Sequence, residues 1–401
     1  MSKILFLTNL LPFPLDNGGK IKTYNTLKAL EELFEIDLFC FVDSEKDYNN
    51  ITEMQKKFSN IKNINVLKKT LIKDSSKSKF LYDYTKSLFT LNPYNINKYF
   101  DKRAVSIIRK LISENKYEHI YIDHLPLMIY SKIIPGNISL ILDQHNVESL
   151  IIKRYFTEQS NPIKKLLLWN EYKKIYRFEK RMLIEANKVI ALSREDSSQF
   201  EAMGCEKSKI SILPIHMDVK NIIYKFREKN RKISILFIGS MSWTPNQHGI
   251  LWFLENVWPQ LDKSIYTLYI VGGNPPERVK KFHNAKDIFV TGYVIDVDYY
   301  IEICDVSIVP LFVGSGQRVK IIESFGKGIP VISTSIGAEG LIYKDKNNII
   351  IADDKNDFIK AFDFLIKDKS ILEEVSLNAR QVFDKHYSSA LLPSKLKKAL
   401  K

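Results

Sequence analysis

The residues best suited to chemistry lie near the C-terminal end of the chain, where glycines, two cations and a carboxylate occur close together. The glycines within 314–316 allow a backbone to approach a ligand, and apolar residues recur at helical spacing over 319–325. A helix that begins there would direct N–H groups at an anion, and Arg318 and Lys320 would add positive charge. Glu323, one turn further on, suits two hydroxyl hydrogen bonds. Together these residues fit a sugar nucleotide.

The elements that must position these residues follow a regular alternation of apolar strand-like runs and helical patterns, which predicts an α/β fold of two Rossmann-like, doubly wound domains. A chain of 401 residues exceeds what one core usually serves. We expect a first domain over 1–216, a second over 217–385 with a hinge near 216–230, and a tail, 386–401, that packs back on the first. The predicted strands are 3–8, 36–42, 119–122, 140–143, 189–192, 234–238, 267–271, 288–291, 306–310, 331–333 and 349–351.

Composition narrows the class of protein. The three cysteines are far apart and have no metal-binding spacing, which indicates a reducing compartment. The apolar run at 4–7 is interrupted by Thr8-Asn9 and predicts a strand rather than a signal peptide. No segment reaches the roughly 18 uninterrupted apolar residues of a membrane-spanning helix. We therefore expect a cytoplasmic protein.

The net charge is +14, and residues 151–190 form the most basic helical stretch, in which lysines and arginines are interleaved with aromatic residues. Apolar residues at spacings of three and four over 168–186 predict an amphipathic helix. Its basic face is either an ordinary solvated surface or a contact with an anionic membrane, to which each nearby cation contributes about 1 kcal/mol. A second basic stretch at 62–79 would support the same surface. No nucleic-acid motif accompanies the charge, so we expect no nucleic-acid partner.

Further candidates follow the predicted strands, because ligands of open parallel sheets bind beyond the carboxyl ends of the strands. The Gly18-Gly19 pair fits a tight turn or a ligand contact. His124 and His145 follow two successive strands, which favours a role in binding for both. Glycine-led turns also follow strands of the second half, at 239–246 and at Gly272.

The pair Asp296 and Asp298 matches the D-x-D pattern by which many sugar transferases bind a divalent metal. Its position between a strand and an apolar helical pattern favours the start of a helix instead, where acidic residues interact well with the helix dipole. His, Cys and Glu residues at metal-ligand spacing are lacking elsewhere in the sequence. We therefore predict no metal and no other cofactor.

With these residues assembled, the chain resembles the retaining glycosyltransferases of family 4, which have the two-domain GT-B fold with the active site in the cleft between two Rossmann-like domains. The resemblance is strongest over 239–246, 290–298, 305–310 and 314–341. The segments 143–149 and 193–196 are also similar to the family, and 193–196 together with 337–341 resembles enzymes of bacterial surface-polysaccharide assembly.

The resemblance implies roles for single residues. In the E-x7-E motif of the family, Glu323 matches the second carboxylate, which binds the nucleotide ribose. Ser315 stands where the first carboxylate would contact the donor sugar, so the expected donors there are backbone N–H groups of the Gly-Ser-Gly loop. Arg318 and Lys320 would bind the donor diphosphate, and His124 would contact the donor sugar.

The implied activity is transfer of a sugar from a nucleoside-diphosphate donor to a glycan or polyprenyl-linked acceptor, with retention and without metal, at the inner face of the cell membrane. Two alternatives remain: a sugar-nucleotide 2-epimerase on the same fold, and a non-catalytic sugar-nucleotide- or carbohydrate-binding subunit. The predicted catalytic residues are His124, Arg318, Lys320 and Glu323. The predicted donor-binding residues are Gly18, Gly19, His145, Asn146, Gly239, Ser240, Asn246, Gly272, Tyr293, Ser315, Gly316, Gln317 and Glu323.

Overall fold

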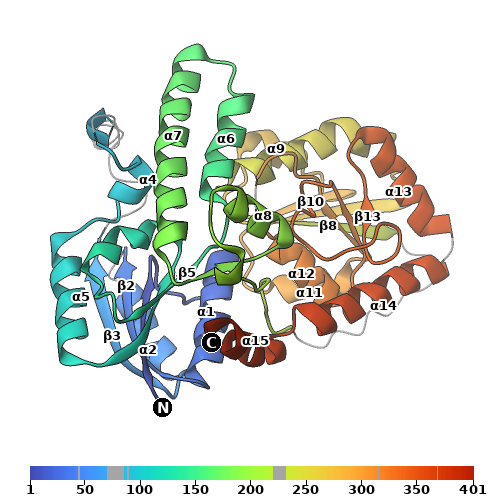
Figure 1. Ribbon diagram of the computed structural model, residues 1–401. Coiled ribbons are helices and arrows are strands. Elements are labelled where there is room, and N and C mark those ends of the chain that lie inside the picture. The colour runs from blue at the N-terminus through green and yellow to red at the C-terminus, as the bar shows by residue number, and fades with distance from the viewer. Residues whose placement is uncertain (44–45, 70–84, 88–89, 220–231, 315, 368) are drawn as a thin grey trace. The chain divides into compact units, whose positions relative to one another are not determined.

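The structure is a computed structural model in which the chain forms two compact units (Figure 1). Unit 1 consists of Met1–His216 together with Ser389–Lys401, and unit 2 consists of Met217–Ser388. The C-terminal segment therefore belongs to the same unit as the N-terminus. The residues described are 1–43, 46–69, 85–87, 90–219, 232–314, 316–367 and 369–401.

Unit 1 is built on a seven-stranded parallel sheet, counted over the described residues, in the order β3-β2-β1-β4-β5-β6-β7. Strands buried on both faces read as continuous apolar runs, and β1 and β2 are of this kind. The strands are β1 (Lys3–Thr8), β2 (Glu35–Val42), β3 (Ile61–Lys68), β4 (Tyr117–Asp123), β5 (Ser139–Asp143), β6 (Lys188–Ala191) and β7 (Ile210–Ile212). The helices are α1 (Gly18–Glu31), α2 (Lys46–Gln55), α4 (Tyr94–Asn97), α5 (Lys102–Glu114), α6 (Glu148–Glu158), α7 (Pro162–Glu185), α8 (Arg194–Ala202) and α15 (Leu392–Leu400), with short 3-10 turns at Leu125–Ile133, Lys207–Lys209 and Ser389–Leu391.

The core of unit 1 covers both faces of this sheet. Leu5 and Leu7 of β1 belong to one hydrophobic cluster, and the alternate residues Ile4 and Phe6 belong to another. This division follows from the two-residue period of a strand. Helix α15 contributes Leu396 and its apolar neighbours to the cluster of Ile4 and Phe6, so the last turns of the chain complete a core that begins at the N-terminus.

Unit 2 repeats the design with a six-stranded parallel sheet, again counted over the described residues, in the order β10-β9-β8-β11-β12-β13. Both orders begin with three strands in reverse and continue outward from the first strand, which is the Rossmann arrangement. The strands are β8 (Ile233–Ile238), β9 (Tyr266–Val271), β10 (Ile288–Gly292), β11 (Val306–Val309), β12 (Val331–Ser333) and β13 (Ile350–Ile351). The helices are α9 (Thr244–Trp252), α10 (Glu277–Lys280), α11 (Val297–Ile303), α12 (Val319–Gly326), α13 (Lys355–Lys367) and α14 (Lys369–His386), with a π turn at Phe253–Val257 and a 3-10 turn at Trp258–Gln260.

The predicted α/β class with two doubly wound domains is confirmed. The runs at 3–8 and 331–333 have the same bounds as β1 and β12. The sequence predicts no strand at β3 or β7, which both lie at a sheet edge and have few buried residues. The basic stretch at 62–79 is β3 as far as Lys68, and 70–79 lie outside the described residues, as do 220–231 of the predicted hinge.

The basic stretch at 151–190 contains α6 and α7, which pack side by side, and the amphipathic pattern at 168–186 falls on α7 (Figure 1). Ile175, Phe178 and Met182 of α7 are buried, as their spacing predicts. The first turns of α7 have exposed apolar residues as well: Ile163 is 71% exposed and Leu166 is 63% exposed. The basic face is therefore interspersed with exposed hydrophobic side chains.

Two findings bear on the compositional expectations. Cys40, Cys205 and Cys304 are all buried and form no disulfide. Among the helices of the described residues, none combines the length and the apolar character needed to cross a membrane.

Candidate functional site

The carboxyl ends of β1 and β4 meet at Asp123, which the sequence analysis did not single out. Thr8 and Asp123 are directly opposite one another in the parallel register. Asp123 is fully buried, and its Oδ2 accepts hydrogen bonds from the hydroxyls of Thr8 and Thr23, each at 2.8 Å. Its Oδ1 lies 2.7 Å from Nε2 of His145. Asp123 therefore links strands β1 and β4, helix α1 and the segment after β5.

The predicted residues His124 and His145 are brought together by these strands. Their ring centroids are 3.5 Å apart. His124 has a φ of 84°, a conformation that non-glycine residues rarely adopt and that is frequent at functional sites. Its side chain is 17% exposed, whereas that of His145 is 6% exposed.

Burial governs the protonation of this cluster. Burial, together with the positive charges of His124 and Lys22, lowers the pKa of His145 to about 4. The pKa of His124 is also lowered, again mainly by burial. Burial would raise the pKa of Asp123, but attraction to His145 and His124 holds it below its usual range. At neutral pH the cluster is thus a carboxylate beside two neutral imidazoles.

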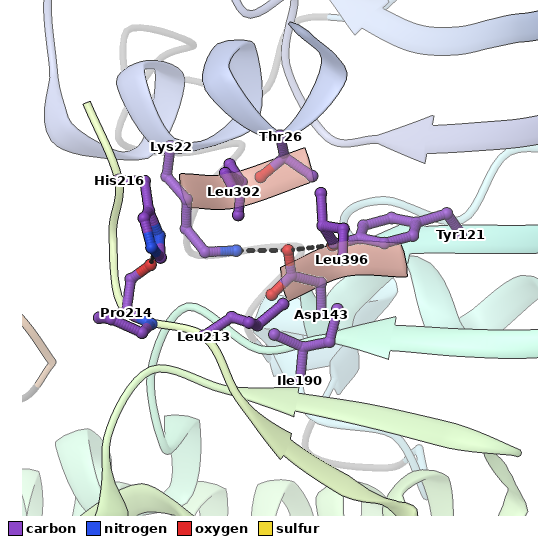
Figure 2. A pocket seen from close by; sticks show the side chains of 10 residues that line it. All are labelled: Lys22, Thr26, Tyr121, Asp143, Ile190, Leu213, Pro214, His216, Leu392 and Leu396. Carbon is purple, nitrogen blue, oxygen red and sulfur yellow. Dashed lines mark hydrogen bonds and ion pairs between the residues drawn. The ribbon is translucent and has the colours of Figure 1, made fainter. Parts of the chain in front are cut away.

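A second buried carboxylate, Asp143, ends β5 and forms an ion pair with Lys22 of α1. Tyr121 donates a hydrogen bond of 2.6 Å to the same oxygen, Oδ2. Figure 2 shows Lys22 and Asp143 beside a small pocket in unit 1, with Leu392 and Leu396 of α15 in its lining. The other oxygen of Asp143 has no hydrogen bond among the described residues. The cavity, about 10 Å³, is close to the smallest that holds one water molecule.

The predicted residue Asn146 lies in a loop whose flanking residues donate hydrogen bonds to Glu179 of α7. Oε1 of Glu179 accepts from Nε2 of Gln144 at 3.1 Å and from the backbone N–H of Glu148 at 2.9 Å. Oε2 accepts from the N–H of Ser149 at 3.0 Å. Burial raises the pKa of Glu179 to about 7, although the hydrogen bonds from Ser149 oppose that rise. The carboxyl group caps α6, which has no capping side chain of its own at Val147.

The predicted pair Gly18-Gly19 begins α1. Asn17 caps this helix, since its Oδ1 accepts a hydrogen bond from the N–H of Lys20 at 3.0 Å. Both glycines are half-buried at the positive end of a 14-residue helix. This placement agrees equally with the tight turn and with the ligand contact that the sequence leaves open.

In unit 2, the predicted residues Gly239 and Gly272 follow neighbouring strands, and their backbones touch. A Cβ atom on Gly272 would lie 2.0 Å from the carbonyl oxygen of Gly239. Gly272 also has a φ of 157°. The glycine at 272 is thus required by packing at this edge of the sheet.

The predicted residues Asn246 and Lys320 bind one another near this edge. Asn246 donates to the carbonyl of Ser240 at 2.9 Å, and its Oδ1 accepts from Nζ of Lys320 at 3.0 Å. Burial lowers the pKa of Lys320 to about 7, and the charge of Arg318 contributes to the shift. Because its pKa is near neutrality, an anion bound here would change its protonation.

Gly314 and Gly316, which precede α12, lie against the side chain of Arg318. Gly314 and Gly316 have φ values of 139° and 81°, which favour glycine. Nη1 of Arg318 donates to the carbonyl of Gly316 at 2.8 Å, and a Cβ on Gly314 would lie 2.5 Å from Nη2. Gln317 donates to the carbonyl of Gly340 at 2.7 Å. The predicted residue Ser315 lies outside the described residues.

The predicted residues Tyr293 and Glu323 differ from one another in exposure and in contacts. Tyr293, just after β10, is 79% exposed. Glu323 on α12 is 24% exposed and forms an ion pair of 2.6 Å with Lys327, whose side chain is 2% exposed. Lys327 also pairs with Asp298 at 2.5 Å. Lys327 was not predicted as part of the site, because the sequence does not show which carboxylates its side chain reaches.

The two aspartates of the D-x-D pair have different partners: a backbone N–H for Asp296 and a lysine for Asp298. Asp296 caps α11 by accepting a hydrogen bond from the N–H of Tyr299 at 3.3 Å, as the helix-start interpretation expects. Asp298 binds Lys327. Within the described part of the chain, the group that brings three metal-ligand atoms close together is Asp123, His124 and His145, whose atoms lie within 4.8 Å of one another. The expectation of no metal stays a prediction.

A change of His145 to glutamine tests the neutral state of this imidazole. The folded pKa of about 4 lies below the unfolded value of 6.5, so between these values the unfolded chain binds the extra proton. Stability should therefore fall as the pH drops from 7 to 5, and His145 should account for about 2 kcal/mol of that loss. We expect His145→Gln, measured by denaturant unfolding at both pH values, to lose correspondingly less. His248→Gln, at an exposed position, should lose as much as the wild type, and equal losses in all three proteins would contradict the assignment.

The sequence of the chain is similar to those of several known proteins. Residues 232–368 match the family model described as Glycosyl transferases group 1. Over 402 aligned residues, the chain is 23% identical to the Uncharacterized 44.6 kDa protein in cps region of Klebsiella pneumoniae, covering 97% of both chains. It is 25% identical to the Chitobiosyldiphosphodolichol beta-mannosyltransferase of Debaryomyces hansenii, covering 68% of this chain and 62% of that protein.

Solved structures resemble the chain over nearly its whole length. Anabaena Alr3699/HepE in complex with UDP and glucose has a TM-score of 0.68 at 15% identity and covers 100% of this chain and 99% of that one. Sucrose-phosphate synthase from Thermosynechococcus elongatus has a TM-score of 0.73 at 14% identity, with 99% and 98% covered. The chain therefore has the GT-B fold, and its residues 232–368 match the family described as Glycosyl transferases group 1.

Proposed function

We propose that this protein is a glycosyltransferase that moves a sugar from a nucleoside-diphosphate donor to a glycan or lipid-linked glycan acceptor in the assembly of a bacterial surface polysaccharide. The observation that carries the proposal is the position of Arg318, Lys320 and Glu323. All three lie inside the segment that matches the glycosyltransferase family model, around the start of a helix behind a glycine-rich loop.

The relatives support the nature of the substrates. A structure similar in fold was solved with UDP and glucose, which supports a nucleoside-diphosphate sugar as the donor. One relative has a name that refers to a diphosphodolichol-linked sugar, which supports a lipid-linked acceptor, and another has a name that refers to a cps region.

The chemistry proposed for unit 2 is stabilisation of the leaving group. When the sugar–phosphate bond breaks, negative charge develops on the departing diphosphate. The guanidinium of Arg318 and the ammonium of Lys320 would stabilise that charge more strongly in the transition state than in the bound donor. Glu323 would accept hydrogen bonds from the ribose. Transfer would proceed with retention and without a metal.

The chemistry proposed for unit 1 rests on its neutral imidazoles. Because burial lowers the pKa of His124, its ring can both accept and donate hydrogen bonds at neutral pH. Such a ring can bind sugar hydroxyls without adding charge. The contact with the ring of His145 restricts the ring of His124, which supports the predicted contact to the donor sugar.

The first test removes the groups proposed to bind the diphosphate and the ribose. A thermal-shift screen with UDP-, GDP- and ADP-sugars should first identify the donor, because a ligand of the folded state raises the melting temperature. With that donor, Arg318→Ala and Glu323→Ala should each lower kcat/KM by tenfold or more, since each loses a charge-assisted hydrogen bond. Near-wild-type rates in both variants would refute the site.

The same assay separates the proposed activity from its alternatives. Conversion of the sugar nucleotide without any acceptor would favour the 2-epimerase. Tight binding of the donor, without transfer or slow hydrolysis across a broad acceptor panel, would favour a non-catalytic binding subunit. The anomeric configuration of the product, read by NMR, would establish whether transfer proceeds with retention.

The second test uses the pKa of Lys320, which is about 7. Above this pH the free protein loses the ammonium that would bind the diphosphate, while the charge of the diphosphate no longer changes. The affinity for the matching nucleoside diphosphate should therefore fall between pH 7 and pH 9, by up to about tenfold per unit. In Lys320→Met the affinity should be lower and flat across this range. Lys286→Met, at an exposed position, should keep the wild-type slope, and a slope that persists in Lys320→Met would refute the role.

The third test concerns the proposed contact with an anionic membrane, for which the start of α7 is the best candidate. Ile163, Leu166 and Trp169 are exposed at intervals of three residues, and Lys164 and Lys165 lie between them. Cations and exposed apolar side chains on one helix suit an anionic lipid surface. Lys164→Glu with Lys165→Glu should abolish cosedimentation with phosphatidylglycerol vesicles. Lys180→Glu, near the other end of α7, should not, and unchanged cosedimentation in the double variant would exclude this helix.

A further inference from the structure

One buried ammonium connects the helix that has the predicted ribose ligand with the neighbouring helix of unit 2. Nζ of Lys327 lies 2.6 Å from Oε1 of Glu323 and 2.5 Å from Oδ1 of Asp298. The side chain of Lys327 is 2% exposed, whereas those of both carboxylates are 24% exposed. The ammonium is therefore inside the protein, and the two carboxylate side chains are partly exposed to the solvent.

The geometry leaves one oxygen of Glu323 available. Lys327 binds Oε1, and among the described residues the side chain of Glu323 makes no other hydrogen bond or ion pair. Lys327 follows Glu323 by one helical turn and is the C-cap residue of α12. The ion pair therefore selects one orientation of the carboxylate, with Oε2 free to accept a hydroxyl.

Asp298 completes the arrangement from α11. A lysine held by a single carboxylate keeps several side-chain conformations, and a second partner on another helix restricts them. The two carboxylates would also repel one another if the ammonium between them were removed. One cation thus orients Glu323 and offsets part of the negative charge that a diphosphate donor would meet.

We infer that Lys327 is a positioning residue for nucleotide recognition: together with Asp298 it holds Glu323 in the orientation that binds a ribose hydroxyl. The inference rests on the proposed function, because it concerns the donor that unit 2 would bind. It gives the second aspartate of the D-x-D pair a role in donor binding that involves no metal.

The test measures the contribution of a ribose hydroxyl in the presence and absence of Lys327. Calorimetry would compare UDP or GDP, whichever binds the wild type, with its 2′-deoxy and 3′-deoxy forms. Deletion of the hydroxyl that Glu323 binds should weaken wild-type binding about tenfold, as expected for a hydrogen bond to a charged group. Glu323→Gln should weaken binding of the parent nucleotide and reduce this penalty.

Lys327→Met should behave like Glu323→Gln. The parent nucleotide should bind about tenfold more weakly, and the penalty for the missing hydroxyl should fall below about threefold. Lys327→Arg, which can bind both carboxylates, should restore most of the penalty. Lys286→Met, the same replacement at an exposed position, should leave it unchanged. A general loss of structure would weaken all of the nucleotides equally and would not remove the difference between them.

A second variant decides the matter if Lys327→Met does not fold. Asp298→Asn removes one of the two charged partners of Lys327 and leaves Glu323 intact, so the hydroxyl penalty should become smaller than in the wild type. A full penalty in every folded variant of Lys327 and Asp298 would overturn the inference and leave the proposed function standing. Failure of the wild type to bind any nucleoside diphosphate or its sugar would overturn both.

Discussion

Parallel pairing in register is the constraint on which the rest of this structure depends. It places Thr8 beside Asp123 and Asp123 beside Asp143, so residues far apart in the sequence form one row at one edge of the sheet. The row buries two carboxylates, and buried charges persist only with partners. Thr8, Thr23 and His145 bind the first, and Lys22 and Tyr121 bind the second. Helix α1 supplies two of these five partners, so its position is fixed by charge as well as by packing.

The two units use charge in opposite ways. In unit 1 the buried carboxylates are matched by hydroxyls and one lysine, and the imidazoles beside Asp123 stay neutral because burial lowers their pKa values. In unit 2 two cations lie near one another, and the charge of Arg318 helps to lower the pKa of Lys320. A bound anion would favour the charged form of Lys320, so a lysine whose pKa is lowered in this way is suited to an anion-binding site.

The sequence predicts the parts of the structure that depend on local pattern. Strands such as β1 and β12 consist mainly of buried apolar residues because both faces are covered, and their bounds follow from that. In the edge strand β3, apolar residues are interspersed with asparagine and lysine, so the sequence there resembles a polar surface segment. In the candidate site, the histidines at successive strand ends were predictable because parallel strands end together. Asp123 and Lys327 were not, because their roles arise from side chains that meet only after α1 and α11 are in place.

Helix α15 has a consequence for the order in which the protein can fold during synthesis. Unit 2 is a continuous stretch of chain and can form as soon as it leaves the ribosome. Unit 1 is interrupted, since α15, which contributes to its core beside Ile4 and Phe6, is made only after unit 2. Its first 216 residues therefore lack this part of their core until α15 has been made. Of the two units, the one whose synthesis begins first is therefore the one that is completed later.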